Sequence, residues 1–261
     1  MNATAIAIAG HPLVTLGGML SVALLVATGA ARFVHTSQPG QRRRRVIVIG
    51  GAVVTLAIVV FATQATGVAN GRTPVLFDET LAAALSQAPL PILSTVLAAL
   101  THLGDRAVLV ALVVAVAALL LVVRRPGFAV AWGLACIGNG LLNPALKQIF
   151  ARARPVHDAA YATVGEFSFP SGHTSGSVVV YGMLAYGALR LAPPRWHLPI
   201  VLAAVALMIT VAFSRVYLRV HWASDVAAGF ASGAAWLAIC VMVLEQQRVR
   251  ALLARSPLTA L

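Results

Sequence analysis

The segment from Ser214 to Asp225 places two arginines, a histidine and a carboxylate within twelve residues of an otherwise apolar sequence. His221 and Asp225 are four residues apart, so on a helix they share one face and the carboxylate can hold one imidazole nitrogen. This pairing fixes the tautomer and leaves the other nitrogen free to act as a nucleophile. Arg215 lies close enough in sequence to bring positive charge to an anion at the same place. The alternative is that these arginine and histidine side chains only mark the water interface at the end of a membrane helix.

A second group of cations follows the apolar run that ends near Phe150. Lys147, the only lysine of the chain, lies seven residues before Arg154. If a helix continued through Arg154, this spacing would be close to two turns and both side chains would point the same way. A compact ammonium beside a planar guanidinium suits a phosphate with several oxygens. The alternative is snorkelling of Lys147 and Arg152 at a helix end.

The third polar motif runs from Phe169 to Thr174 and has the pattern of a helix start that binds an anion. Pro170 fits the first helical turn, and Ser171 and Gly172 then expose backbone N–H groups. A helix N-terminus favours an anion, and Gly172 lets the backbone approach it closely. His173 beside such an anion can act as a general acid, because a nearby negative charge favours its protonated form. A hydrogen-bonded interface histidine is the alternative for His173.

Composition identifies the setting of these motifs. Hydrophobic residues make up 60% of the chain and charged residues only 10%, whereas soluble domains carry about 25% charged residues. We therefore expect an integral membrane protein. Cys136 and Cys240 lie in apolar runs and lack metal-ligand spacing, so they are expected to be small core residues.

Hydropathy predicts an all-α, polytopic membrane bundle of about seven transmembrane helices, because the bilayer core requires about 20 helical residues per span. No lysine or arginine precedes the first run, which argues against a signal peptide. Residues 67–103 are expected to form one or two short helices at the interface. The expected spans are Leu13 to Phe33, Val46 to Thr66, Asp105 to Val123, Phe128 to Phe150, Ser171 to Arg190, Leu198 to Phe213 and Ser224 to Leu244.

The arginines predict how these spans are oriented. With seven spans and the N-terminus outside, one side of the membrane carries a net charge of +11 and the other +1. The positive-inside rule makes the +11 side cytoplasmic, together with the run Arg42 to Arg45 and the C-terminus. The chain's net charge of +12 is then mostly a topology signal, and no nucleic-acid partner is expected. All three polar motifs emerge on the outer face.

Taken together, the three motifs resemble the signature segments of the type 2 phosphatidic acid phosphatase (PAP2) family, which shares its site with vanadium haloperoxidases. The resemblance covers roughly residues 46–244. Two positions depart from the family pattern: Ala223 stands where proline is common, and Arg219 where a small residue is common. We expect these changes to alter the loop or the head-group preference and not the chemistry. The motifs that carry the resemblance are Lys147-x6-Arg154-Pro155, Pro170-Ser171-Gly172-His173 and Ser214-Arg215-x5-His221-x3-Asp225.

The resemblance implies a fold, a division of the chain and a mechanism. It implies a six-helix PAP2-like core at residues 46–247, preceded by an extra helix and basic loop at 1–45 and followed by a basic tail at 248–261. His221 would attack phosphorus and become a phosphohistidine, Asp225 would orient it, and His173 would protonate the leaving oxygen and then activate water. The sequence shows no acidic cluster for Mg²⁺, so neither metal nor cofactor is predicted. The implied phosphate ligands are Lys147, Arg154, Ser171, Gly172 and Arg215.

The implied function is a lipid phosphatase of a bacterial-type inner (plasma) membrane, acting at the outer membrane face. Polyprenyl diphosphates such as undecaprenyl diphosphate are the expected substrates, with phosphatidylglycerophosphate or phosphatidate next, a ranking that rests on family analogy. A phosphotransferase that passes the phosphoryl group to a second lipid or sugar remains an alternative. So does a non-hydrolytic lipid transporter, although its charges would more naturally lie near the bilayer midplane. A haloperoxidase is least favoured, and the oligomeric state is open. Further candidates for head-group contacts are Arg152, Arg219, His157 and Glu166.

Overall fold

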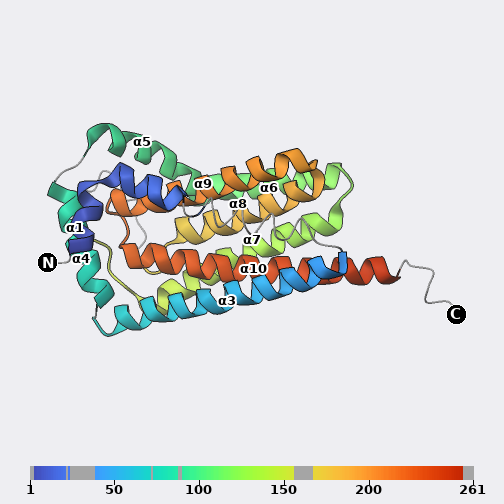
Figure 1. Ribbon diagram of the computed structural model, residues 1–261, viewed down its shortest axis with the longest axis horizontal. Helices are drawn as coiled ribbons and strands as arrows, with labels where there is room; N and C mark the ends of the chain where they lie inside the picture. The colour runs from blue at the N-terminus through green and yellow to red at the C-terminus, as the bar shows by residue number, and fades with distance from the viewer. Residues whose placement is uncertain are drawn as a thin grey trace.

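The computed structural model describes residues 3–21, 23, 39–71, 73–87, 90–155 and 167–254. Every regular element in these ranges is a helix, which confirms the all-α membrane bundle (Figure 1). The elements are α1 (Ala3–Gly10), α3 (Pro39–Ala69), α4 (Thr73–Gln87), α5 (Pro91–Thr101), η1 (His102–Gly104), α6 (Arg106–Val122), α7 (Pro126–Phe150), α8 (Gly172–Leu191), η3 (Pro194–Trp196), α9 (His197–Tyr217) and α10 (Ala223–Ala254).

The expected count of seven spans is not confirmed. Within the described ranges, the helices long and apolar enough to cross a membrane are four, namely α3, α7, α9 and α10. Two bent pairs raise the number to six if each forms one span: Ala3–Gly10 with Pro12–Ser21, bent by 98°, and Pro91–Gly104 with Arg106–Val122, bent by 46°. The first bend falls between Gly10 and Pro12, where proline removes a backbone donor. Most of the first expected span lies outside the described residues.

The fifth expected span forms α8, but it is too polar to count as a span by composition. Its position in the bundle explains this polarity, because eight consecutive residues from Thr174 to Tyr181 are buried and together cover every face of the helix. The neighbouring α10 approaches α8 closely. A Cβ at Gly229 would lie 2.7 Å from the Ser171 carbonyl oxygen, and one at Gly233 would lie 3.0 Å from the Ser175 carbonyl oxygen. α8 is therefore surrounded by protein and need not be lipid-compatible.

Three local expectations require correction. Arg42 to Arg45 do not lie in a loop, because α3 begins at Pro39 and arginine is a good helix former. The basic tail assigned to residues 248–261 does not start as a separate segment, because α10 continues to Ala254. Residues 67–103 contain two helices, as expected, but only α4 stands apart; α5 joins α6 in the second bent pair. The break at η1 is tightly packed, since a Cβ at Gly104 would lie 2.5 Å from the Val211 side chain.

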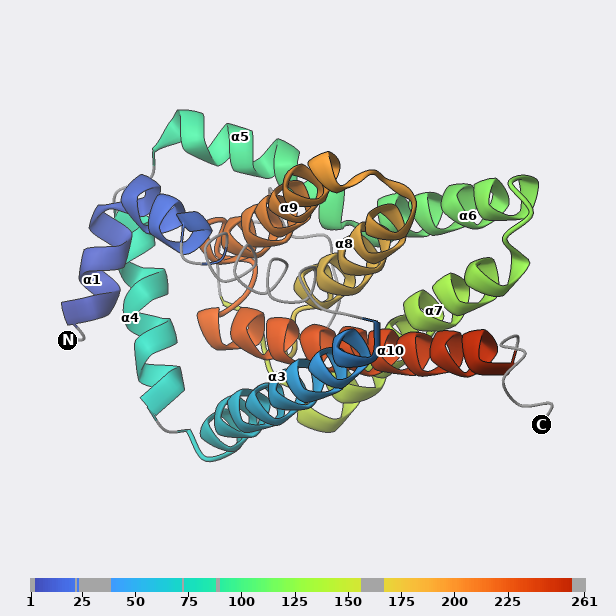
Figure 2. The same cartoon turned by 45° about the vertical axis from the view of Figure 1, so that its right-hand side comes forward.

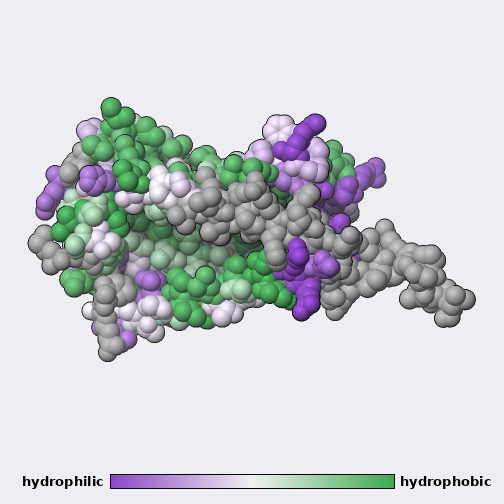
Figure 3. Space-filling model, in the orientation of Figure 1, coloured by the Kyte–Doolittle hydropathy of each residue, from purple (hydrophilic) through white to green (hydrophobic). Residues whose placement is uncertain are grey.

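One end of the bundle gathers the segments that carry the polar motifs. α1 and α4 lie side by side there, next to the end of α7, the start of α8 and the loop between α9 and α10 (Figures 1 and 2). Phe61, Phe150 and Phe169 pack against one another with ring centroids 4.9–5.9 Å apart, joining α3 to the segments on either side of residues 156–166. Apolar residues cover much of the flank, with hydrophilic ones mainly toward the ends (Figure 3).

Candidate active site

His221 is where two of the three motifs meet. Its Nε2 lies 3.1 Å from Arg154 Nη1, which also donates to the Val220 carbonyl at 2.7 Å. On the other side of the ring, Nδ1 lies 3.3 Å from Asp225 Oδ2. These contacts bring residues 67 positions apart in sequence into one group, at the end of the bundle described above.

The partners of His221 determine its tautomer. Arginine can only donate, so Nε2 facing Arg154 must carry the lone pair. A carboxylate accepts, so Nδ1 carries the proton and donates it to Asp225. The Nε2 lone pair is thus directed at the cationic groups, where a phosphate would be bound.

His221 and Asp225 do not share a helix, contrary to the expectation. α10 begins at Ala223, and His221 lies in the loop before it. The pairing survives because the Asp225 side chain turns back and accepts from the Trp222 amide at 3.0 Å. This is the backward half of a capping box, in which an acidic side chain in the first turn satisfies an amide before the helix.

Electrostatics favours the neutral form of His221. Burial, followed by the charges of Arg154, Arg215 and Lys147, holds the pKa of His221 well below its usual value. The imidazole is 3% exposed, and a protonated ring there would lose its hydration among other cations. A neutral ring with a free lone pair is the form that can attack phosphorus.

Replacing Arg154 with glutamine is expected to lower kcat/KM by about 10²-fold or more, because the cation that contacts His221 Nε2 is lost. The same change removes a charge that depresses the pKa of His221, so this pKa rises. More enzyme is then protonated and inactive at acidic pH, and the acid limb of the kcat/KM profile moves to higher pH. Arg190→Gln removes an arginine paired with Glu245 at the other end of the bundle and should leave the limb in place. An unmoved limb in Arg154→Gln would contradict this electrostatic account.

Lys147 and Arg154 do not lie on one helical face. α7 ends at Phe150, and Ala151 takes a left-handed conformation with φ of 44°. The chain turns back there, so both cations reach the Phe167 carbonyl, Lys147 Nζ at 2.5 Å and Arg154 Nη2 at 3.3 Å. Lys147 and Arg154 therefore do lie together, but the turn after α7 brings them together and not a shared helical face.

The start of α8 also differs from the expectation. Pro170 follows a cis peptide bond and precedes the helix, Ser171 is the N-cap, and Gly172 is the first helical residue. The Ser171 amide donates to the Asp225 carbonyl at 3.0 Å and is already engaged, whereas its hydroxyl accepts from Thr174 and keeps its own proton to donate. The amides of Gly172 and the residue after it are those that a helix start leaves without an intrahelical acceptor. Binding of phosphate oxygens by Ser171 and Gly172 stays a prediction.

Arg215 is buried near the same place and is held by its neighbours. It is 4% exposed, and its Nη1 donates to Thr101 Oγ1 at 3.0 Å. The Ser214 hydroxyl oxygen lies 2.8 Å from the same Thr101 oxygen. Within the described part of the chain, the Arg215 Nε has no hydrogen-bond partner. A buried donor without an acceptor costs about 1–3 kcal/mol, and a phosphate oxygen would remove that cost.

The third motif contributes His173, which belongs to a second carboxylate–histidine group. Its Nε2 lies 2.7 Å from Asp105 Oδ1, and His102 Nδ1 lies 2.6 Å from the other oxygen of Asp105. The carboxylate holds the Nε2 proton of His173, which leaves Nδ1 for a leaving group. The sequence interpretation placed Asp105 only at the start of a span. The available signal was a carboxylate just before a long apolar run, on the side of the membrane where the three motifs were expected.

A buried ionic network holds the Asp225 carboxylate through the oxygen that does not face His221. Arg152 donates to Asp225 Oδ1 at 2.7 Å and to Asp78 Oδ2 at 2.9 Å, and the Ser224 hydroxyl also donates to Asp78. Burial raises the pKa of Asp78, and the hydrogen bonds from Ser224 and Arg152 oppose this. Arg152 thus fixes the carboxylate that orients His221, a stronger role than the head-group contact considered for it. Asp78 on α4 was missed, because nothing in the sequence links α4 to the last helix.

The remaining candidates are placed as follows. His157 and Glu166 lie outside the described residues. Arg219 lines a cavity beside the site.

Comparisons with known proteins fit this geometry. The sequence profile of the PAP2 superfamily matches residues 128–248. The chain is 32% identical over 169 residues to phosphatidylglycerophosphatase B of Bacillus subtilis (strain 168), covering 60% of this chain and 77% of that protein. It is 35% identical over 114 residues to lipid A 1-phosphatase of Rhizobium johnstonii, covering 41% of this chain and 43% of the relative.

A solved structure shares the fold. The transmembrane PAP2-type phosphatidylglycerolphosphate phosphatase from Bacillus subtilis superposes with a TM-score of 0.68 at 27% identity, over 74% of this chain and 96% of the other. The range matched by the family profile contains Lys147, Arg154, His173, Arg215 and His221.

Proposed function

Because the chain belongs to the PAP2 superfamily and is a multi-pass membrane lipid phosphatase within it, we propose that it removes a terminal phosphate from a lipid head group through a phosphohistidine at His221. One observation carries this proposal. A buried, neutral imidazole presents the Nε2 lone pair to a cluster of cations, with Asp225 behind it. We propose that residues 46–247 form the phosphatase domain.

In the first chemical step the Nε2 of His221 forms a bond to phosphorus while the bond from phosphorus to the lipid oxygen breaks. Burial and the charge of Arg215 lower the pKa of His173 to about 4, whereas Asp105 and a bound phosphate anion favour its protonated form. In that form His173 gives the leaving oxygen a proton from Nδ1, and Asp105 holds its other nitrogen. Asp225 stabilises the positive charge that His221 gains. Lys147, with Arg154 and Arg215 beside it, would hold the remaining phosphate oxygens.

In the second step the phosphoryl group passes to water. His173, now neutral at Nδ1, takes a proton from the water as its oxygen bonds to phosphorus. The bond from phosphorus to the Nε2 of His221 breaks, and inorganic phosphate leaves. Both histidines return to their starting protonation states, so the cycle is balanced.

Phosphatidylglycerophosphate is the proposed substrate. The support is similarity, since a relative and a solved structure that match much of this chain are named for this activity. Undecaprenyl diphosphate, which the sequence interpretation ranked first, stays a prediction. Both lipids present a terminal phosphate at a membrane surface, so the same chemistry would serve either.

We place the site on the extracytoplasmic side of the membrane. The supporting observation is that the N-terminus of α3, the α6–α7 turn, the α8–η3 turn and the end of α10 lie at the opposite end of the bundle (Figure 1). Arginines gather in those segments, among them Arg44, Arg125 and Arg195. The positive-inside rule assigns that end to the cytoplasm.

Purified protein in detergent is expected to release phosphate from phosphatidylglycerophosphate equally well with and without EDTA. Cationic side chains already supply the positive charge that Mg²⁺ provides in other phosphoryl-transfer enzymes. The measurement is phosphate release from phosphatidylglycerophosphate, phosphatidate and undecaprenyl diphosphate, each with EDTA and with added Mg²⁺. Release from none of the three would reject the proposed function. Loss of activity in EDTA, restored by Mg²⁺, would reject the metal-free mechanism alone.

A further inference from the structure

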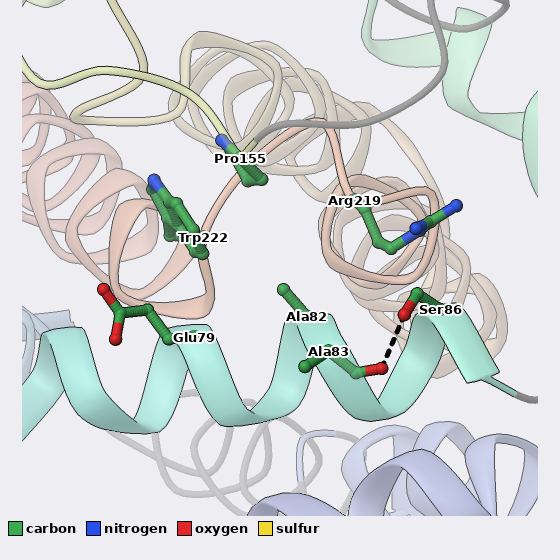
Figure 4. A pocket seen from close by; sticks show the side chains of 7 residues that line it. All are labelled: Glu79, Ala82, Ala83, Ser86, Pro155, Arg219 and Trp222. Carbon is green, nitrogen blue, oxygen red and sulfur yellow. Dashed lines mark hydrogen bonds between the residues drawn. The ribbon is translucent and has the colours of Figure 1, made fainter.

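A cavity of about 290 Å³ lies between α4 and the loops that carry the site (Figure 4). α4 lines one side, with Glu79 and Ser86 among its residues. Pro155, Arg219 and Trp222 line the other side. The cavity has charged residues of both signs, so it is not an ordinary packing gap between apolar surfaces.

Residues that line the cavity are direct neighbours of Arg154 and His221 in the chain, and a hydrogen bond joins the two loops that carry them. Pro155 directly follows Arg154, and Trp222 directly follows His221. The Trp222 indole donates to the Ala153 carbonyl at 3.0 Å, which holds the two loops together. The same two loops therefore supply Arg154, His221 and one wall of this cavity.

Arg219 stands out among the lining residues. Its φ is 55°, in the left-handed region where glycine is favoured and any side chain is strained. Such strain persists where the surrounding structure or the function requires the residue. The Arg219 side chain forms no hydrogen bond or ion pair with any other residue that the structure describes. Arg219 and Ser86 lie at one end of the cavity, whereas Glu79 and Trp222 lie toward the other (Figure 4).

We propose that this cavity binds the part of the lipid head group that remains after cleavage, with Arg219 holding a second, non-scissile phosphate. The inference rests on the proposed function and narrows its substrate class. Glu79 disfavours an anion at its own end of the cavity, so the second phosphate is directed toward Arg219.

The separation of Arg219 from the nucleophile His221 bears on which lipids fit. Arg219 and His221 are two residues apart, so their Cα atoms are at most about 7.6 Å from each other. Two phosphates joined through a glycerol linker span a comparable distance, as in phosphatidylglycerophosphate. In a diphosphate the two phosphorus atoms share one oxygen and lie close together. The second phosphate would then lie beside Arg154 and Arg215 and would not reach Arg219. Phosphatidate has no second phosphate.

The test measures binding, so it does not depend on turnover. Short-chain phosphatidylglycerophosphate and phosphatidate are titrated by calorimetry into the His221→Ala protein, with and without Arg219→Gly. Loss of a charge-assisted contact should weaken binding of phosphatidylglycerophosphate by roughly tenfold or more and leave that of phosphatidate unchanged. Because glycine accepts the left-handed conformation, Arg219→Gly should not lower the melting temperature, which separates a ligand contact from a structural role.

Two further variants sharpen the result. Arg219→Lys keeps the charge and should retain most of the affinity. Arg124→Gly removes another arginine with positive φ, 58°, at the opposite end of the bundle, and should change binding of neither lipid. If Arg219→Gly weakened binding of both lipids equally, Arg219 would act only by general electrostatic attraction and the proposal would be overturned. If Arg219→Gly weakened binding of neither lipid, the proposal would also be overturned. Binding that depends on Arg219, together with wild-type protein that releases phosphate from no lipid, would instead reject the proposed function.

Discussion

His221→Ala is expected to abolish phosphate release, with a loss of at least about 10⁴-fold in kcat. Among the residues that the structure describes, Asp225 and Arg154 both converge on this imidazole and on no other histidine. Alanine removes the nucleophile and leaves its partners in place. The measurement is steady-state release of phosphate from phosphatidylglycerophosphate in detergent.

The control for this variant is another histidine in a helix end. His197 lies at the start of α9, at the other end of the bundle, and its Nε2 contacts the Ala192 carbonyl at 3.1 Å. His197→Ala should retain activity. Both variants should keep wild-type circular dichroism spectra. Residual activity of His221→Ala above about one part in a hundred would mean that the nucleophile lies elsewhere, since general-base effects alone reach 10²–10⁴-fold.

His173→Ala is expected to separate the two chemical steps. With a lipid substrate the alkoxide leaves without a proton, and single-turnover cleavage should slow by about 10²–10⁴-fold. With p-nitrophenyl phosphate the leaving group needs no proton, so a burst of nitrophenolate should persist at nearly the wild-type rate. Slow turnover should follow, because His173 is also needed to activate water. Stopped-flow absorbance measures the burst directly.

The burst distinguishes a general acid from a structural histidine. Asp105→Asn provides a companion variant, because it removes the charge paired with His173 and keeps the side-chain shape. It should show a milder form of the same behaviour, with slower lipid cleavage and a retained burst. Loss of the burst in His173→Ala, with intact folding, would indicate that His173 shapes the site and does not transfer a proton.

Much of the site was predictable because its residues lie in short local motifs. Local spacing linked His221 with Asp225, and helix-start chemistry linked Gly172 with an anion. The positive-inside rule predicted that the three motifs share one face of the membrane. The structure brings His221 and Arg154 into contact, with Lys147 bonded to the same carbonyl as Arg154.

What escaped prediction depends on tertiary contacts. Asp78 and Arg152 are 74 residues apart and meet only because α4 lies across the end of the bundle. Asp105 and His173, 68 residues apart, meet at the break between η1 and α6. Sequence periodicity describes one helix at a time and cannot pair such residues. The end of α7 at Ala151 was also hidden, because alanine gives no local signal for a left-handed turn.

The count of seven spans is not confirmed, for a related reason. Hydropathy treats every apolar run as facing lipid, but α8 is enclosed by protein and carries serine and threonine on buried faces. Conversely, α5 and α6 are separate helices that together satisfy the length of one span. Hydropathy therefore cannot distinguish a helix that faces lipid from one that is buried inside the bundle.

Transfer of the phosphoryl group to His221 can be tested by trapping the intermediate. His173→Ala protein is mixed with p-nitrophenyl phosphate, quenched in alkali during the burst, digested and sequenced by mass spectrometry. Phosphohistidine is stable in alkali, so we expect a phosphoryl group on the peptide containing His221, in an amount equal to the burst. A burst without a phosphorylated peptide, or a phosphoryl group on another residue, would contradict it.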